Sequence, residues 1–80
     1  MLEISTLSDL MPDECGRIRE TQSTPLTKRL SELGFVPGRE VRCLFTGSAG
    51  DPRAYLIRET VIALRRETAD HVLVEKEAKR

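Results

Sequence analysis

The sequence has 80 residues, of which 39% are apolar and 32% are charged, and this length builds a single small core and excludes a multidomain enzyme. The 13 Lys and Arg residues equal the 13 Asp and Glu residues in number, so the excess of positive charge that non-specific nucleic-acid binding requires is lacking, and we expect no nucleic-acid partner. Two cysteines do not make the disulfide framework of a small secreted domain, and neither a basic leader nor a long apolar run is present, which predicts a cytoplasmic protein without direct membrane insertion.

A first strand is predicted at about residues 17–21. Ile18 would face the core there while Arg17 and Arg19 face water, which is the alternation of a half-buried strand. Residues 5–16, before it, are too interrupted for a stable helix and end in a turn.

A short amphipathic helix is predicted next, with Thr24 as its N-cap and Pro25 at its first position. Its apolar face would consist of Leu26, Leu30 and Leu33. Gly34 can end the helix in a left-handed conformation, which places Phe35 to pack back on Leu30 as in a Schellman motif.

The second half of the chain is predicted to form strands. They cover residues 39–46, 53–59, a strand through Ile62 and Leu64, and 71–75, with one helical turn at 66–70. The inward positions would be Val41, Cys43, Phe45, Tyr55, Ile57, Ile62, Leu64, Val72 and Val74. Five short strands with one helix after the first, and no later connection long enough for a crossover helix, predict a mainly β fold, a small closed barrel over residues 1–75 with a charged tail at 76–80.

No group of side chains predicts catalysis, so we do not expect an enzyme. The single histidine, His71, is expected to be a polar residue at a strand entry. The loop at residues 47–50 lacks the Lys-Ser/Thr ending of a phosphate-binding loop.

Metal and cofactor sites are not predicted either. Cys15, Cys43 and His71 supply suitable donor atoms without a recognisable spacing. Asp9, Asp13 and Glu14 could offer oxygen ligands, but acids near turns more often cap backbone donors or face water.

Strand alternation also leaves apolar side chains on the outside of the barrel, namely Leu44, Leu56, Val61, Ala63 and Leu73. Two interpretations stay open. The helix and the first segment cover these side chains, or they form a patch that binds another protein or a second copy of the chain. On the second interpretation Leu44, Leu56, Val61 and Leu73 are the candidate partner-binding residues.

Three sequence pieces in fixed order resemble the FeoA family. They are RLSELGFVPG at residues 29–38, GDP at 50–52 and IALR at 62–65, and the resemblance extends from about Thr6 to Val74. The resemblance implies an SH3-like barrel and a non-catalytic cytoplasmic accessory protein of ferrous iron uptake. Such a protein would bind the membrane transporter FeoB and modulate its activity or assembly. No iron-ligand motif is carried over.

The positions that match the family pattern are Gly34, Pro37, Gly38, Asp51, Pro52 and Arg65, and the resemblance implies structural roles for them. The chain has Glu59 where many relatives have Gly, and Pro12-Asp13 where they have a Pro-Gly turn. The module also resembles the C-terminal domain of iron-dependent repressors. That leaves an alternative open, a free-standing metal-sensing or self-associating regulatory module in which Cys15, Cys43 or His71 binds a metal.

Overall fold

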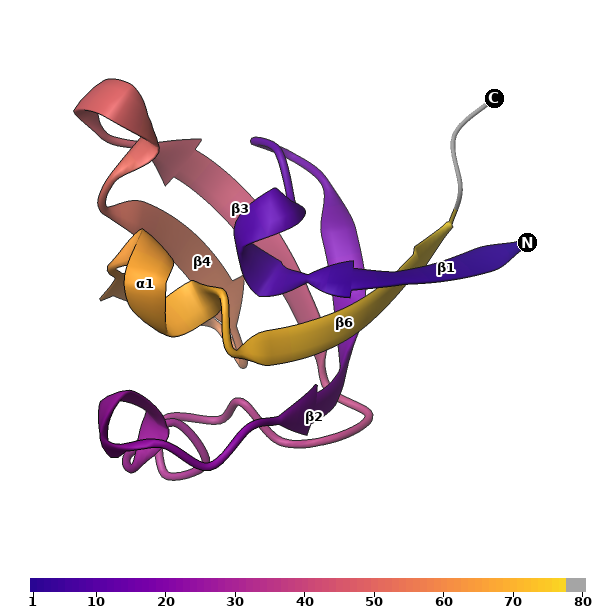
Figure 1. Cartoon of the computed structure of the whole chain (residues 1–80). Coiled ribbons are helices and arrows are strands. Elements are labelled where there is room, and N and C mark those ends of the chain that lie inside the picture. The colour runs from indigo at the N-terminus through magenta and orange to yellow at the C-terminus, as the bar shows by residue number, and fades with distance from the viewer. Residues whose placement is uncertain (78–80) are drawn as a thin grey trace.

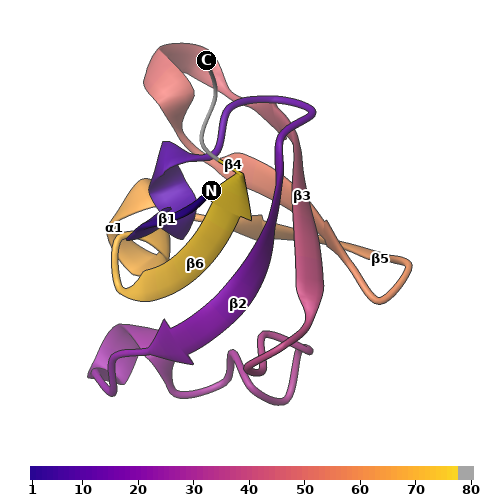
Figure 2. The ribbon, with the colours of Figure 1, turned by 90° about the vertical axis from the view of Figure 1, so that its right-hand side faces the viewer.

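The computed structural model describes residues 1–77, and residues 78–80 lie outside this description. The chain forms one six-stranded antiparallel sheet in the order β1-β6-β2-β3-β4-β5 (Figure 1). The strands are β1 (Leu2–Thr6), β2 (Cys15–Thr21), β3 (Glu40–Thr46), β4 (Arg53–Ile57), β5 (Thr60–Leu64) and β6 (Val72–Glu77). Short helical segments connect them: η1 (Leu7–Asp9), η2 (Pro25–Thr27), η3 (Ser48–Gly50) and α1 (Arg66–Ala69). The fold is therefore mainly β, as predicted, and Figure 2 shows β6 and β2 curving side by side.

The strand count and the closure of the sheet differ from the prediction. The sixth strand, β1, is at one edge and pairs with β6 from Leu2 opposite Glu77 to Thr6 opposite Leu73. Residues 2–4 are exposed, so β1 lacks the alternation that marks a half-buried strand. Among the described residues the strand pairings end at β1 and β5, and no pairing joins these two edges. β6 extends to Glu77, two residues past the boundary expected for the charged tail, whose residues 78–80 lie outside the described part.

The predicted amphipathic helix is wrong, because η2 is followed by a series of turns. Most hydrogen bonds within this segment join residues three apart, such as Thr27 N–H to Thr24 O and Leu30 N–H to Thr27 O, each 3.1 Å. A repeat of three residues places Thr27 beside Leu30 on the buried side. Leu26, one residue before Thr27, is consequently 45% exposed, whereas Leu30 is 3% exposed. Leu33, just before Gly34, is 41% exposed.

This segment nevertheless ends in the hydrogen-bond pattern of a Schellman motif. Phe35 N–H donates to Leu30 O at 3.0 Å and Gly34 N–H donates to Ser31 O at 3.1 Å. Gly34 has a φ of 110°, a conformation that favours glycine. Phe35 and Leu30 both belong to the core.

A β-bulge in β3 overturns the predicted orientation of Phe45. Cys43 pairs with Tyr55, but Phe45 pairs with Ala54, so one extra residue stands between the two pairs. An extra residue reverses the alternation beyond it. Phe45 therefore lies on the outward face and is 60% exposed.

The interior contains a buried arginine–tyrosine pair that the sequence did not reveal. Arg53 is 5% exposed and Tyr55 fully buried. Arg53 Nε donates to the Tyr55 hydroxyl at 3.0 Å and its Nη2 donates to Leu10 O at 2.7 Å, while the Tyr55 hydroxyl donates to Leu7 O at 3.2 Å. These bonds attach β4 to the segment that begins with η1, and they satisfy polar atoms that burial would otherwise leave unpaired.

Candidate docking surface

The outward face of β3, β4 and β5 carries two of the predicted partner-binding residues side by side. Leu56 on β4 pairs with Val61 on β5 and with Arg42 on β3, and directly paired residues share a face. The neighbours of Leu56 along β4, Tyr55 and Ile57, are buried in the core, so Leu56 faces outward. Leu56 is half-buried and Val61 is 56% exposed.

The bulge in β3 adds Phe45, which was predicted to face inward, to this outward surface. Phe45 pairs with Ala54, and Ala54 pairs with Ala63, so these side chains form a second row beside Leu56 and Val61. We call Phe45, Leu56, Val61 and Ala63 the outer patch. No glycine or proline marks the bulge, and strict alternation along β3 gives the wrong side for Phe45.

The other two candidates have different positions. Leu44 is the extra residue of the bulge and is half-buried. Leu73 is on β6, opposite Thr6 and Glu20, and β2 and β3 separate β6 from β4 in the sheet. The structure thus brings Leu56 and Val61 together, places Leu44 next to Phe45 in β3, and leaves Leu73 apart from them.

The interpretation in which other segments cover the exterior residues does not apply to the outer patch. Leu7, Leu10 and Leu30 are buried within the core on the opposite side of the sheet from Leu56. Phe45 and Val61 stay more than half exposed. The outer patch is therefore available for contact.

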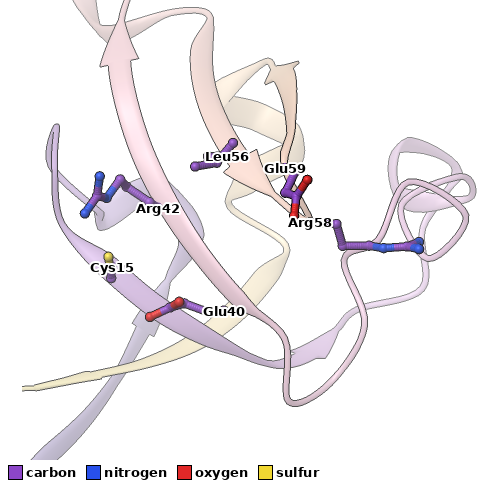
Figure 3. Close-up of a pocket in the computed structure, with 6 residues that line it drawn as sticks. All are labelled: Cys15, Glu40, Arg42, Leu56, Arg58 and Glu59. Carbon is purple, nitrogen blue, oxygen red and sulfur yellow. The ribbon is translucent and has the colours of Figure 1, made fainter.

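A shallow hollow of about 380 Å³ adjoins the outer patch at Leu56 (Figure 3). Its lining residues are Cys15, Glu40, Arg42, Leu56, Arg58 and Glu59. In Figure 3, Leu56 and Arg42 lie across from one another, and Arg58 extends away toward the neighbouring loop. The neighbouring Cys15 side chain raises the pKa of the Arg42 guanidinium, which stays a cation. Two acids and two arginines beside an apolar side chain suit contacts with a mixed protein surface.

The candidate metal donors do not converge. Cys15 is exposed on the outward face, while Cys43 is buried, and burial raises the pKa of the Cys43 thiol. His71 Nδ1 lies 3.0 Å from Gln22 Oε1, in the connection to β6. Within residues 1–77 no group of three or more His, Cys, Asp or Glu side chains is placed to hold a metal ion.

The acids near the first turn contact local backbone. Thr6 N–H donates to Asp9 Oδ2 at 3.4 Å, and Met11 N–H donates to Glu14 Oε1 at 2.7 Å. Glu14 Oε1 is also 3.6 Å from Lys76 Nζ. Asp13 has a φ of 73° in the turn before β2.

The family-pattern positions lie at turns and at the start of α1. Gly38 has a φ of 91° after Pro37. The Asp51–Pro52 peptide is cis. Asp51 Oδ1 accepts a hydrogen bond from Arg66 N–H at 3.0 Å, and Asp51 Oδ2 is 4.0 Å from Arg65 Nη1. Asp51 thus joins the loop before β4 to the start of α1.

These features define a class of protein, a small mainly β domain with an exposed apolar patch on one face of its sheet. A family model described as the FeoA domain matches residues 5–76. The chain therefore belongs to the FeoA family, a family of generally non-catalytic accessory proteins associated with ferrous iron transport.

Two solved structures combine similar folds with appreciable sequence identity. Iron(II) transport protein A from Clostridium thermocellum is 36% identical with a TM-score of 0.81, and the match covers 89% of this chain and 44% of that one. This chain thus matches less than half of that relative. FeoA from Stenotrophomonas maltophilia, complexed with zinc and described as a prokaryotic SH3 domain protein, is 32% identical with a TM-score of 0.79, covering 90% of this chain and 95% of that one.

A third structure shares the fold alone. IdeR from T. acidophilum is 20% identical with a TM-score of 0.77, and the match covers 92% of this chain and 34% of that one. No curated protein matches the chain. In residues 1–77 there is no helix with the length and apolar character needed to span a membrane.

Proposed function

We propose that this protein is a non-catalytic cytoplasmic accessory protein of ferrous iron uptake that binds the cytoplasmic part of the membrane transporter FeoB. It acts on the transporter by contact, modulating its activity or assembly. Family membership supports the iron-uptake role, and the outer patch supports the mode of action.

The exposure of Phe45 is the observation that carries the proposal. The chain has three aromatic residues, two Phe and one Tyr. Phe35 and Tyr55 are almost fully buried, whereas Phe45 is 60% exposed. An exposed Phe forgoes roughly 1.5–3 kcal/mol of burial free energy, and aromatic side chains on open surfaces are frequent anchors of protein interfaces.

The neighbouring groups extend this contact. Val61 and Leu56 continue the apolar surface from β4 to β5, and the hollow beside Leu56 supplies both charge signs at its rim. An apolar centre with a polar rim is the usual arrangement of a protein–protein interface. Leu44 and Leu73 stay candidates for additional contacts.

Binding to the purified cytoplasmic part of FeoB tests the proposal. Phe45→Asp is expected to weaken binding by roughly tenfold or more while the melting temperature changes little. Leu26→Asp is the matched control, because Leu26 is 45% exposed but lies in η2, outside the outer patch. Leu73→Asp reports whether the contact reaches β6. The proposal fails if no complex forms with either that part or the intact transporter.

A further inference from the structure

β5 presents an open sheet edge. Among residues 1–77 it pairs with β4 alone. Ile57 pairs with Thr60 across the two-residue turn of Arg58 and Glu59. In such a hairpin the alternate residues Thr60, Ile62 and Leu64 bond to β4, so Val61 and Ala63 direct their N–H and C=O groups to the open edge.

This edge lacks the features that usually prevent strands from pairing with another chain. The segment Thr60–Leu64 has no charged residue and no proline, and its register with β4 is regular. Edge strands in soluble proteins are commonly protected by charges, prolines or bulges. The opposite edge strand, β1, contains Glu3.

The charges at the two ends of β5 are complementary to a second, antiparallel copy of the same strand. Glu59 precedes β5 and Arg65 follows it. When two copies are aligned antiparallel about Ile62, Val61 of each lies opposite Ala63 of the other, and Glu59 of each lies opposite Arg65 of the other. A shift of this register removes the match between Glu59 and Arg65.

In this register the next residues outward, Arg58 and Arg66, would lie opposite one another, and both side chains have neighbours within their own chain. Arg58 packs against Gly34, where a Cβ atom would lie 2.9 Å from Arg58 Cδ. The guanidinium of Arg66 reaches toward Gly50. Arg58 thus lies beside Gly34 and Arg66 beside Gly50, in two different parts of each chain.

A hollow beside β5 accommodates the inward side chain of the second strand. It measures about 340 Å³ and is lined by Glu32, Leu33, Arg58, Thr60 and Ile62. Ile62 is partly buried against the core. Residues opposite one another in an antiparallel pair share a face, so Ile62 of a second copy would lie beside Ile62 and cover Leu33, which is 41% exposed.

We infer that two copies of this chain associate by antiparallel pairing of their β5 edges about a two-fold axis at Ile62. Each pair of Val61 and Ala63 exchanges two backbone hydrogen bonds, and each Glu59 faces an Arg65. The two six-stranded sheets then form one continuous sheet. The outward face of β4 stays free, so this inference does not depend on the proposed binding of FeoB.

Sedimentation velocity on the full chain alone, over a concentration series, tests the inference. The average mass is expected to rise with concentration toward twice that of one chain. Ala63→Pro removes an edge N–H without removing a bond to β4 and is expected to abolish the dimer. A chain that stays monomeric at all concentrations, or a dimer that persists in Ala63→Pro, would overturn the inference.

A charge experiment tests the register without depending on proline. Glu59→Arg and Arg65→Glu each place like charges at both contacts, and each alone is expected to dimerise roughly fivefold to tenfold more weakly. An equimolar mixture of the two variants opposes Arg with Glu at both contacts and is expected to recover the original association. Glu20→Arg, the same charge change on β2, is the control, and thermal melts verify that each variant is folded. A mixture that associates no better than its components would contradict the Ile62-centred register.

Discussion

Tyr55 is fully buried and its hydroxyl is bonded on both sides, to Arg53 Nε and to Leu7 O. Burial raises the pKa of Tyr55 from its ordinary value of 10.0 to about 12, although the Arg53 side chain opposes this shift. The folded chain therefore keeps the phenol proton at a pH where the unfolded chain has lost it. Arg53 is likewise a charge held inside by hydrogen bonds, an arrangement in which removal of one partner is strongly unfavourable.

The Tyr55 shift predicts a loss of stability at alkaline pH. Because the folded pKa is the higher one, this contribution is fully present below pH 10 and disappears as the pH rises toward 12. The expected loss is about 2–3 kcal/mol, measured by urea unfolding of wild type and Tyr55→Phe, whose difference isolates this group. Tyr55 is the only tyrosine, so tyrosinate absorbance follows it directly. If the Tyr55 phenol of the folded chain lost its proton near pH 10, the prediction would be wrong.

The β4–β5 turn contains two residues in the left-handed region, Arg58 with a φ of 53° and Glu59 with a φ of 72°. Hairpin turns of this kind favour glycine at the second position. Glu59→Gly is expected to raise the free energy of unfolding by about 1 kcal/mol, measured by urea denaturation at low protein concentration. Glu20→Gly, within strand β2, is the control and should be destabilising. A stability loss in Glu59→Gly would show that the Glu59 side chain matters more than the turn conformation.

At the scale of elements, the turns from η2 to Gly34 pack against the β4–β5 hairpin where Gly34 meets Arg58. Gly34→Ala and Gly38→Ala both place a side chain at positive φ, but only at Gly34 would the new Cβ meet Arg58. Both variants are expected to lose about 1–2 kcal/mol, with a larger loss for Gly34→Ala. Combining Gly34→Ala with Arg58→Ala should remove the excess, as measured by thermal or urea unfolding. Equal losses at the two glycines would show that Arg58 moves aside freely.

Elements whose residues alternate in burial were predictable from sequence, and the others were not. β4 alternates around buried Tyr55 and Ile57, and β6 around buried Val72 and Val74. β1 has no buried residue and forms because it is hydrogen-bonded to β6. β6 lies some seventy residues further along the chain, and no local sequence pattern indicates this pairing. The prediction of an amphipathic helix after Thr24 was wrong because Thr27, a polar residue, occupies the buried position beside Leu30.

The residues of the candidate surface were predictable only where the strands alternate regularly. Leu56 and Val61 follow regular alternation and were placed outward. Phe45 was placed inward because the bulge that turns it outward depends on the pairing between β3 and β4. Sequence alone also grouped Leu73 with these residues, since the order of strands in the sheet, which separates β6 from β4, is a tertiary property.

At the scale of the whole molecule, β5 contributes to two surfaces with different expected uses, through the side chains of Val61 and Ala63 and through their backbone groups. The outer patch of Phe45, Leu56, Val61 and Ala63 faces away from the sheet, while the β5 edge lies in its plane. Binding of FeoB and pairing of two copies can therefore occur together. Two copies paired at β5 would present two outer patches on one sheet, and linked sites bind a multivalent target more tightly than single sites.

The central position of β6 has a consequence for biosynthesis. This last strand lies between β1 and β2, with Ile4 opposite Glu75 and Ile18 opposite Val74. A nascent chain that still lacks these residues leaves both earlier strands without their shared neighbour. The complete sheet can therefore assemble only after β6 has been synthesised, and the distant pairings favour slow folding once it has.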